Sequence, residues 1–212
     1  MLVLGLDTSS PAVSAALVSL TASGVEVLAE SVVVDGRRHG ELLAQGVRSV
    51  LDGRRPDAVV VGAGPGPFTG LRVGLMTVAA MSDALVVPAY AVCSLDGLAD
   101  EGDVVVVTDA RRREVYWARY VAGERVDGPS VVRPADLVAQ LRQGERLVGA
   151  GAVLHRDVLG EVDESVLHPS VPRLVARAAD RVLAGEPGDP LTPLYLRRPD
   201  AVEPGAAKRV TA

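Results

Sequence analysis

Aromatic residues and cysteine are scarce in this sequence, and both shortages limit what the protein can be. Aromatic residues make up 3% of the 212 residues, although 48% are hydrophobic. The core must therefore be built from Val, Leu and Ala, which suits packed layers of sheet and helix better than an aromatic-lined pocket. The single cysteine, Cys93, excludes an internal disulfide and a cysteine-based zinc site. We expect it to be a small buried residue in a reducing compartment.

Positive charge and long apolar runs are also in short supply. The net charge of −5 argues against a protein that holds nucleic acid by itself, because neutralising phosphates needs an excess of Lys and Arg. The N-terminal segment has no basic region, and its apolar run is too short for a signal peptide or a membrane span. We therefore expect a cytoplasmic protein that has no membrane contact and reaches RNA only with help.

The sequence does contain a segment rich in glycine and proline, residues 62–80, which reads GAGPGPFTGLRVGLMTVAA. It predicts a tight, rigid loop between a buried strand at 57–61 and a helix over 69–85. Unpaired N–H groups at the start of that helix could receive an anion or a partner's backbone, or the loop could be a structural corner. The segment has neither the Gly-Lys-Ser/Thr ending of a Walker A loop nor the context of a Rossmann fingerprint.

The order of the predicted elements occurs twice along the chain. It predicts a duplicated α/β fold with two half-domains, 1–100 and 101–212, each with a mixed sheet and flanking helices. We expect a last helix that packs back on the first half-domain, and a flexible tail from about residue 198. The predicted strands are 2–6, 12–19, 25–34, 57–61, 104–107, 114–121 and 146–148, and the predicted helices are 39–51, 69–85, 94–99, 134–143 and 172–184.

The helix over 69–85 is apolar nearly all round. A stripe that includes Leu71 and Leu75 would face its own sheet, whereas a second stripe with Val73, Met76 and Ala80 would not. An apolar stripe that the sheet does not cover implies another helix or another chain against it.

A polar turn, Asp7, Thr8 and Ser9, lies at the tip of the first predicted hairpin. Actin, Hsp70 and sugar-kinase architectures place their first phosphate-binding turn at this point. Hydroxyl and N–H groups there could hold phosphate, and the carboxylate could hold magnesium through water. The alternative is a turn that its own Asp and Ser side chains stabilise.

The matching turn of the second half has Asp109 followed by Arg111, Arg112 and Arg113. Because it is not the glycine-rich pocket that a second phosphate turn needs, it argues against a kinase or ATPase that acts alone. The arginines form the only dense basic run of the chain. They are either a solvated hairpin tip or a contact for RNA or nucleotide phosphate.

The histidines do not suggest a metal site. His39 begins the helix over 39–51, but the position one turn later on the same face is Leu43. His155 and His168 are isolated, and no His-Glu-x-x-His motif occurs. We therefore expect no bound metal, and a metallopeptidase is the weakest of the alternatives.

Four motifs resemble those of the TsaB (YeaZ) family, the small paralogues of the TsaD proteins: LGLDTSS, RRHGELL, GPGPFTGLRVG and PLYLRRPDA. The resemblance spans nearly the whole chain, although Pro67 stands where the family commonly has Ser. It implies a duplicated actin/Hsp70-like (ASKHA, ribonuclease H-like) fold. It also implies a noncatalytic subunit of the bacterial machinery that builds threonylcarbamoyladenosine next to the tRNA anticodon.

In that machinery TsaD transfers the threonylcarbamoyl group, while TsaB and TsaE assist. The resemblance implies that this chain binds TsaD and TsaE, forms a homodimer in isolation, and meets tRNA only through the complex. It implies no cofactor of its own, because the complex uses the ATP, with weak nucleotide binding left open. Family members pair through two helices of the first half, and the partner-facing residues this implies are His39, Leu42, Leu43, Val47, Thr69, Arg72, Val73, Met76 and Ala80.

Overall fold

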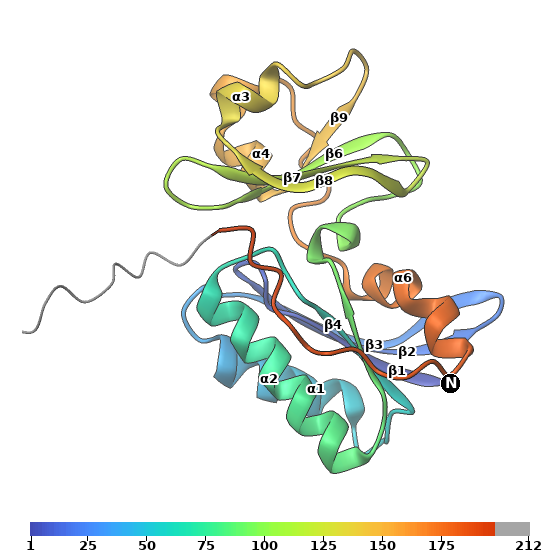
Figure 1. Ribbon diagram of the computed structural model, residues 1–212. Coiled ribbons are helices and arrows are strands. Elements are labelled where there is room, and N and C mark those ends of the chain that lie inside the picture. Colours follow the sequence, from blue (N-terminus) through green and yellow to red (C-terminus); the bar gives the residue numbers. More distant parts are fainter. Residues whose placement is uncertain (198–212) are drawn as a thin grey trace, which may run out of the picture.

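The computed structural model describes residues 1–197 as two mixed β-sheets with helices against their faces (Figure 1). The predicted flexible tail from residue 198 lies outside the described residues. Within them, none of the helices combines the length and the hydropathy needed to cross a membrane.

The first sheet has the strand order β3-β2-β1-β4-β5. Its first three strands form the predicted antiparallel meander, and β4 and β5 continue parallel to β1. The prediction missed β5, because Pro88 and a short apolar run resemble a connector. The strands are β1 Leu2–Asp7, β2 Ala12–Thr21, β3 Gly24–Val34, β4 Ala58–Gly62 and β5 Ala89–Val92.

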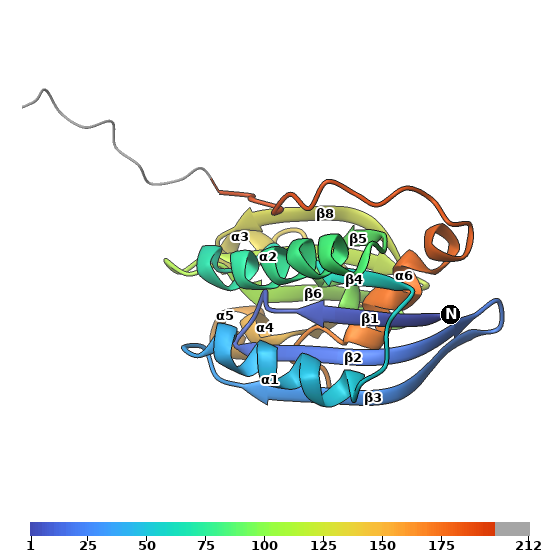
Figure 2. The same ribbon diagram turned by 90° about the horizontal axis from the view of Figure 1, so that it is seen from below.

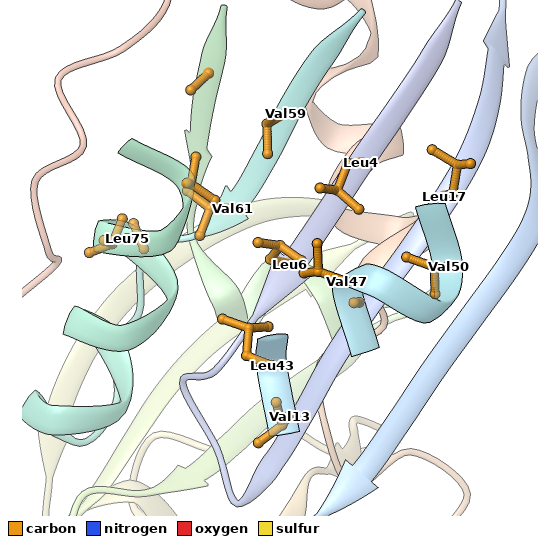
Figure 3. Packing of buried hydrophobic residues seen from close by; sticks show 14 of the residues in the cluster. Leu4, Leu6, Val13, Leu17, Leu43, Val47, Val50, Val59, Val61 and Leu75 are labelled. Atoms are coloured by element: carbon orange, nitrogen blue, oxygen red, sulfur yellow. The ribbon is translucent and has the colours of Figure 1, made fainter. Parts of the chain in front are cut away.

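Helices cover both faces of this sheet. Helix α1 (His39–Leu51) and helix α2 (Phe68–Leu85) pack on one face, and helix α6 (Val171–Leu183) packs on the other (Figures 1 and 2). Figure 3 shows the core under α1 and α2, where Leu43 and Leu75 meet aliphatic side chains of β1, β2 and β4. This part of the core is aliphatic, as the composition predicts, whereas the other clusters also bury Tyr90, Tyr120 and Trp117.

The second sheet repeats the first on a smaller scale, with the order β8-β7-β6-β9. Strand β6 pairs antiparallel with β7 and parallel with β9, just as β1 pairs with β2 and β4. The predicted duplication is therefore confirmed. The elements are β6 Val104–Asp109, β7 Val115–Val121, β8 Glu124–Val132, β9 Arg146–Val148, α3 Pro134–Val138, α4 Ala150–Leu154 and α5 Arg156–Leu159, with the 3₁₀ helix η1 Ser94–Gly97 between the halves.

The helix predicted over 134–143 was too long, because α3 ends at Val138. The guanidinium of buried Arg119 donates to the carbonyl of Gln140 at 2.6 Å and to the carboxylate of Glu145 at 2.5 Å. These contacts fix the segment after α3 in a turn. The helical spacing of the sequence does not reveal this partner on β7, which is why the predicted helix was too long.

The C-terminal segment, residues 184–197, joins the two halves. It leaves α6 and pairs with β5, where the amide of Asp189 donates to the carbonyl of Ala89 at 2.8 Å. The amide of Leu194 then donates at 2.8 Å to the carbonyl of Ala63, which lies in residues 62–74, here called the glycine loop. The guanidinium of Arg197 reaches the carboxylate of Glu114 in the second half. Figure 2 shows this segment in red beside α2 and β5.

Candidate functional site

The polar turn at the end of β1 is buried and held by its own chain. The Asp7 carboxylate accepts hydrogen bonds from the Ser94 hydroxyl at 2.7 Å, the Ser9 hydroxyl at 2.8 Å and the Ser9 amide at 2.9 Å. The Ser94 hydroxyl in turn accepts the amide of Gly64 at 3.0 Å, and the Thr8 hydroxyl donates to the carbonyl of Gly70 at 2.8 Å. The turn and the glycine loop therefore form one hydrogen-bonded unit.

Glycines allow this close packing. A Cβ atom on Gly62 would overlap the Asp7 carboxylate and lie 2.5 Å from the Ser94 hydroxyl. A Cβ atom on Gly70 would lie 2.5 Å from the carbonyl oxygen of Thr8, and one on Gly74 would lie 2.5 Å from the hydroxyl of Thr8. The glycine loop thus occupies the space beside the turn, so a phosphate there would have to displace it.

Burial is the main influence on the Asp7 carboxyl group. It raises the pKa of Asp7 above the ordinary value, although the hydrogen bonds from Ser94 and Ser9 act in the opposite direction. A carboxyl group whose pKa is raised in the folded state loses stabilising free energy as pH rises from its unfolded pKa through its folded pKa.

A pH series on the Asp7→Asn variant tests this environment. We expect the stability of the wild type relative to the variant to increase as pH falls from 7 to 4, because the folded wild type then takes up a proton more readily than the unfolded chain. Urea unfolding at each pH measures the difference between the two proteins. A difference that does not change with pH would contradict the raised pKa.

The second half repeats this close packing of a glycine against the matching turn. A Cβ atom on Gly151 would lie 2.5 Å from the carbonyl carbon of Thr108, next to Asp109. The Asp109 carboxylate accepts the amide of Arg111 at 2.7 Å, and the Arg111 guanidinium lies 3.4 Å from the same carboxylate.

Residues Arg111 to Arg113 form the exposed tip between β6 and β7, with left-handed φ angles of 62°, 53° and 62°. The carbonyl of Arg111 also accepts the Arg197 guanidinium at 3.3 Å, so the C-terminal segment contacts this tip. The run is a hairpin tip, and its contact with RNA or nucleotide stays a prediction.

His39 connects α1 to the first turn. Its Nε2 atom lies 3.0 Å from the carbonyl oxygen of Ser10. Among residues 1–197 there is no cluster of three or more His, Cys, Asp or Glu side chains that could hold a metal ion.

Leu42, Leu43 and Val47, which the resemblance places at a partner interface, point toward the chain's own sheet. All three are buried in the core between α1 and the first sheet, and Figure 3 shows Leu43 and Val47 there. The apolar stripe of an amphipathic helix faces the nearest apolar layer, and here that layer is the chain's own sheet.

The predicted partner-facing residues of α2 lie on its outer side. Thr69, Arg72, Met76 and Ala80 are exposed and Val73 is half-buried, whereas the opposite side of the helix packs in the core. The Met76 side chain is 60% exposed.

This outer side continues into an apolar groove of about 670 Å³ between the ends of α1 and α2. The groove is lined by residues that include Leu51, Pro56, Ala80, Met81 and Leu85. Part of the outer side of α2 is thus a continuous apolar surface.

An aromatic cluster at the start of α2 was not foreseen. The rings of Phe68 and Tyr195 stack with their centroids 5.4 Å apart, and the Arg72 guanidinium lies 4.4 Å from the Phe68 ring centre. The two aromatic residues are far apart in sequence, and no periodic pattern connects them. The only sequence signal was that both lie within family-like motifs.

Cys93 lies half-buried between the halves, and burial raises the pKa of its thiol to about 11. Since the thiolate is the nucleophile, we expect iodoacetamide at pH 8 to modify Cys93 roughly 100-fold more slowly than it modifies free cysteine. Mass spectrometry of the intact protein over time measures the rate. Modification as fast as that of free cysteine would contradict the buried environment.

Comparisons with known proteins point to the family that the sequence motifs resemble. The family model described as "TsaD: tRNA N6-adenosine threonylcarbamoyltransferase" matches residues 32–159. An uncharacterised protein of Mycobacterium tuberculosis is 47% identical over 206 residues, which cover 94% of this chain and 93% of that protein. The Bacillus subtilis protein named "tRNA threonylcarbamoyladenosine biosynthesis protein TsaB" is 29% identical over 179 residues, 76% of each chain.

Among solved structures, YeaZ from Pseudomonas aeruginosa superimposes with a TM-score of 0.76 at 28% identity. The superposition covers 92% of this chain and all of that one. The motifs, the duplicated fold and these similarities show that the chain belongs to the TsaB (YeaZ) family.

Proposed function

We propose that this chain is a noncatalytic assembly subunit of bacterial tRNA threonylcarbamoyladenosine biosynthesis, and that it binds a TsaD-type transferase through the outer side of α2. Family membership supports the pathway, since relatives are named as biosynthesis proteins for this modification. The observation that supports the assembly role is the outer side of α2, where the Met76 side chain is 60% exposed and Val73 is half-buried at the margin of the core.

The geometry of that surface suits a helical partner. Helix α2 has 18 residues, about 27 Å of helix. Its apolar groove adjoins the end of α1, and Arg54 and Arg55 at the rim could pair with acidic residues of a partner. A second pair of helices against this surface would remove Met76 and Ala80 from water.

The polar turn of residues 7–9 has the glycine loop packed against it, which supports an accessory subunit in preference to a kinase or ATPase that acts alone. Asp7 accepts hydrogen bonds from Ser9 and Ser94, and the Thr8 hydroxyl donates to the carbonyl of Gly70. The glycine loop occupies the space beside this turn. We propose further that TsaE joins the complex, that the chain forms a homodimer through the same surface when alone, and that it works in the cytoplasm. In this account tRNA is contacted only through the complex, and the chain needs no cofactor.

Reconstitution of the modification tests the proposal. Purified TsaD-type transferase, TsaE, the enzyme that makes threonylcarbamoyl-adenylate, ATP, threonine, bicarbonate and unmodified tRNA are combined with and without this chain. We expect threonylcarbamoyladenosine to form only when the chain is present. Equal yields of modified nucleoside with and without it would overturn the assembly role.

A further inference from the structure

The exposed aromatic residues of the chain lie together at the start of α2. The chain has one Phe, one Trp and four Tyr, and its Trp and three of its Tyr are buried. By contrast, Phe68 is 53% exposed and Tyr195 is 43% exposed, and their rings stack with the centroids 5.4 Å apart. Aromatic side chains bury large areas and are enriched at protein interfaces, so an exposed pair of rings indicates a contact surface.

This pair continues the outer side of α2. Residues four apart on a helix are neighbours on its surface, so Phe68, Arg72, Met76 and Ala80 form one row along α2. All four are exposed. The Arg72 guanidinium lies 4.4 Å from the Phe68 ring centre and thereby joins the aromatic pair to the rest of the row. The pair is therefore one end of the surface proposed for the partner, not a separate patch.

The ring of Tyr195 comes from the C-terminal segment, and both halves of the molecule hold that segment in place. Just before the ring, the amide of Leu194 donates to the carbonyl of Ala63 at 2.8 Å. Two residues after it, the guanidinium of Arg197 contacts the carboxylate of Glu114 in the second half. Figure 2 shows the segment in red beside α2. Because it is fixed on both sides, Tyr195 is already positioned before a partner binds, which lowers the entropic cost of binding.

Arg72 indicates the chemistry of the side chains that meet this row. Among residues 1–197 no carboxylate pairs with its guanidinium, which lies over the Phe68 ring. A partner that covers the row would take this charge out of water, and a buried guanidinium needs an acceptor, best a carboxylate. The matching surface therefore has apolar side chains opposite Phe68 and Met76 and an acidic side chain within reach of Arg72.

We propose that the C-terminal segment is part of the partner surface, with the stacked rings of Phe68 and Tyr195 as its anchor and Arg72 as the residue that pairs with an acidic side chain of the transferase. The inference rests on the proposed function, because it adds Tyr195 to the surface that binds the TsaD-type transferase. It goes further in that a segment held by the second half contributes to binding by the first.

Tyrosine nitration tests whether the partner covers the ring. Tyr195 is the exposed tyrosine, so tetranitromethane should nitrate it well before the buried Tyr90, Tyr116 and Tyr120. In a complex with the TsaD-type transferase, verified by light scattering, we expect nitration of Tyr195 to slow several-fold. Mass spectrometry of peptides measures the rate. With the Met76→Glu variant, which should not form the complex at the same concentrations, the transferase should leave the rate unchanged.

Isothermal titration measures what the ring contributes to binding. We expect Tyr195→Ser to weaken binding to the transferase about tenfold or more, as truncation of an anchoring aromatic residue does. Tyr195→Phe keeps a ring that can stack on Phe68 and should bind as the wild type does. Leu154→Ser is the matched control, because it truncates a hydrophobic residue that is 59% exposed on α4 in the second half, and it should also bind as the wild type does.

The inference and the proposed function fail in different ways. If Met76→Glu weakens binding but Tyr195→Ser does not, or if Tyr195 is nitrated equally fast in the complex, the inference is overturned and the proposed function stands. If Tyr195→Phe binds as weakly as Tyr195→Ser, the ring is not the anchor. If neither Met76→Glu nor Tyr195→Ser weakens binding, both fail. Protection of Tyr195 by unmodified tRNA alone would also overturn the inference, since the rings would then stack on a nucleobase.

Discussion

The Gly62→Ala variant is expected to lose about 3 kcal/mol or more of unfolding free energy. The added Cβ atom would overlap the Asp7 carboxylate and lie 2.5 Å from the Ser94 hydroxyl. Overpacking a close-packed site typically costs about 1–3 kcal/mol. Here it would also break a buried hydrogen bond to a charged group, worth about 1.5–3 kcal/mol. For a chain of this size the melting temperature should fall by roughly 6–12 °C.

Gly40→Ala is the matched control, because it makes the same chemical change in the same half of the molecule. Gly40 lies in the first turn of α1, and nothing approaches within 4 Å of a Cβ atom there. Alanine is the better helix former by about 0.5–1 kcal/mol, so this variant should be as stable as the wild type or slightly more stable. Thermal unfolding of the wild type and the two variants measures their melting temperatures. If Gly62→Ala melts with the wild type, the turn and the loop are not packed as described.

The Met76→Glu variant is expected to weaken binding to the TsaD-type transferase about 100-fold or more while the chain stays folded. Met76 is 60% exposed in the isolated chain, so a glutamate there meets water and should barely alter stability. In a complex through the outer side of α2, the same carboxylate would be buried without a partner. An uncompensated charge at an interface costs about 3 kcal/mol or more of binding free energy. This cost corresponds to a loss of affinity of about 100-fold or more. Isothermal titration measures the affinity.

Val126→Glu is the matched control, because it places a glutamate at an exposed hydrophobic position outside α2. Val126 is 56% exposed on β8 in the second half, so that variant should bind the transferase as the wild type does. Circular dichroism of both variants shows whether each is folded. Equal affinities for the wild type and the folded Met76→Glu variant would mean that another face of the chain binds the partner.

The sequence predicts the fold well where one pattern determines one element. The bounds of α1 coincide with the prediction over 39–51, and the repeat of strands around Asp7 and Asp109 indicated the duplication that the two sheets confirm. The glycine loop was predicted as a tight corner. Its partner, the buried Asp7 carboxylate, was not, because Ser94 joins them from 87 residues away.

Where prediction failed, a contact distant in sequence decided the outcome. Helix α3 is short because Arg119 on β7 binds the segment after it. The resemblance identified the helix that carries Leu43, but not that this side of the helix packs on the chain's own sheet. Helical periodicity identifies an apolar stripe, and only the neighbouring layer shows whether that stripe is core or interface.

Methionine footprinting tests the central claim, that the outer side of α2 is the partner surface. Met76 and Met1 are 60% and 45% exposed in the isolated chain, so hydrogen peroxide should oxidise both. In a stoichiometric complex with the TsaD-type transferase, verified by light scattering, we predict that oxidation of Met76 slows several-fold while that of Met1 is unchanged. A complex in which Met76 is oxidised as fast as in the free chain would contradict the account.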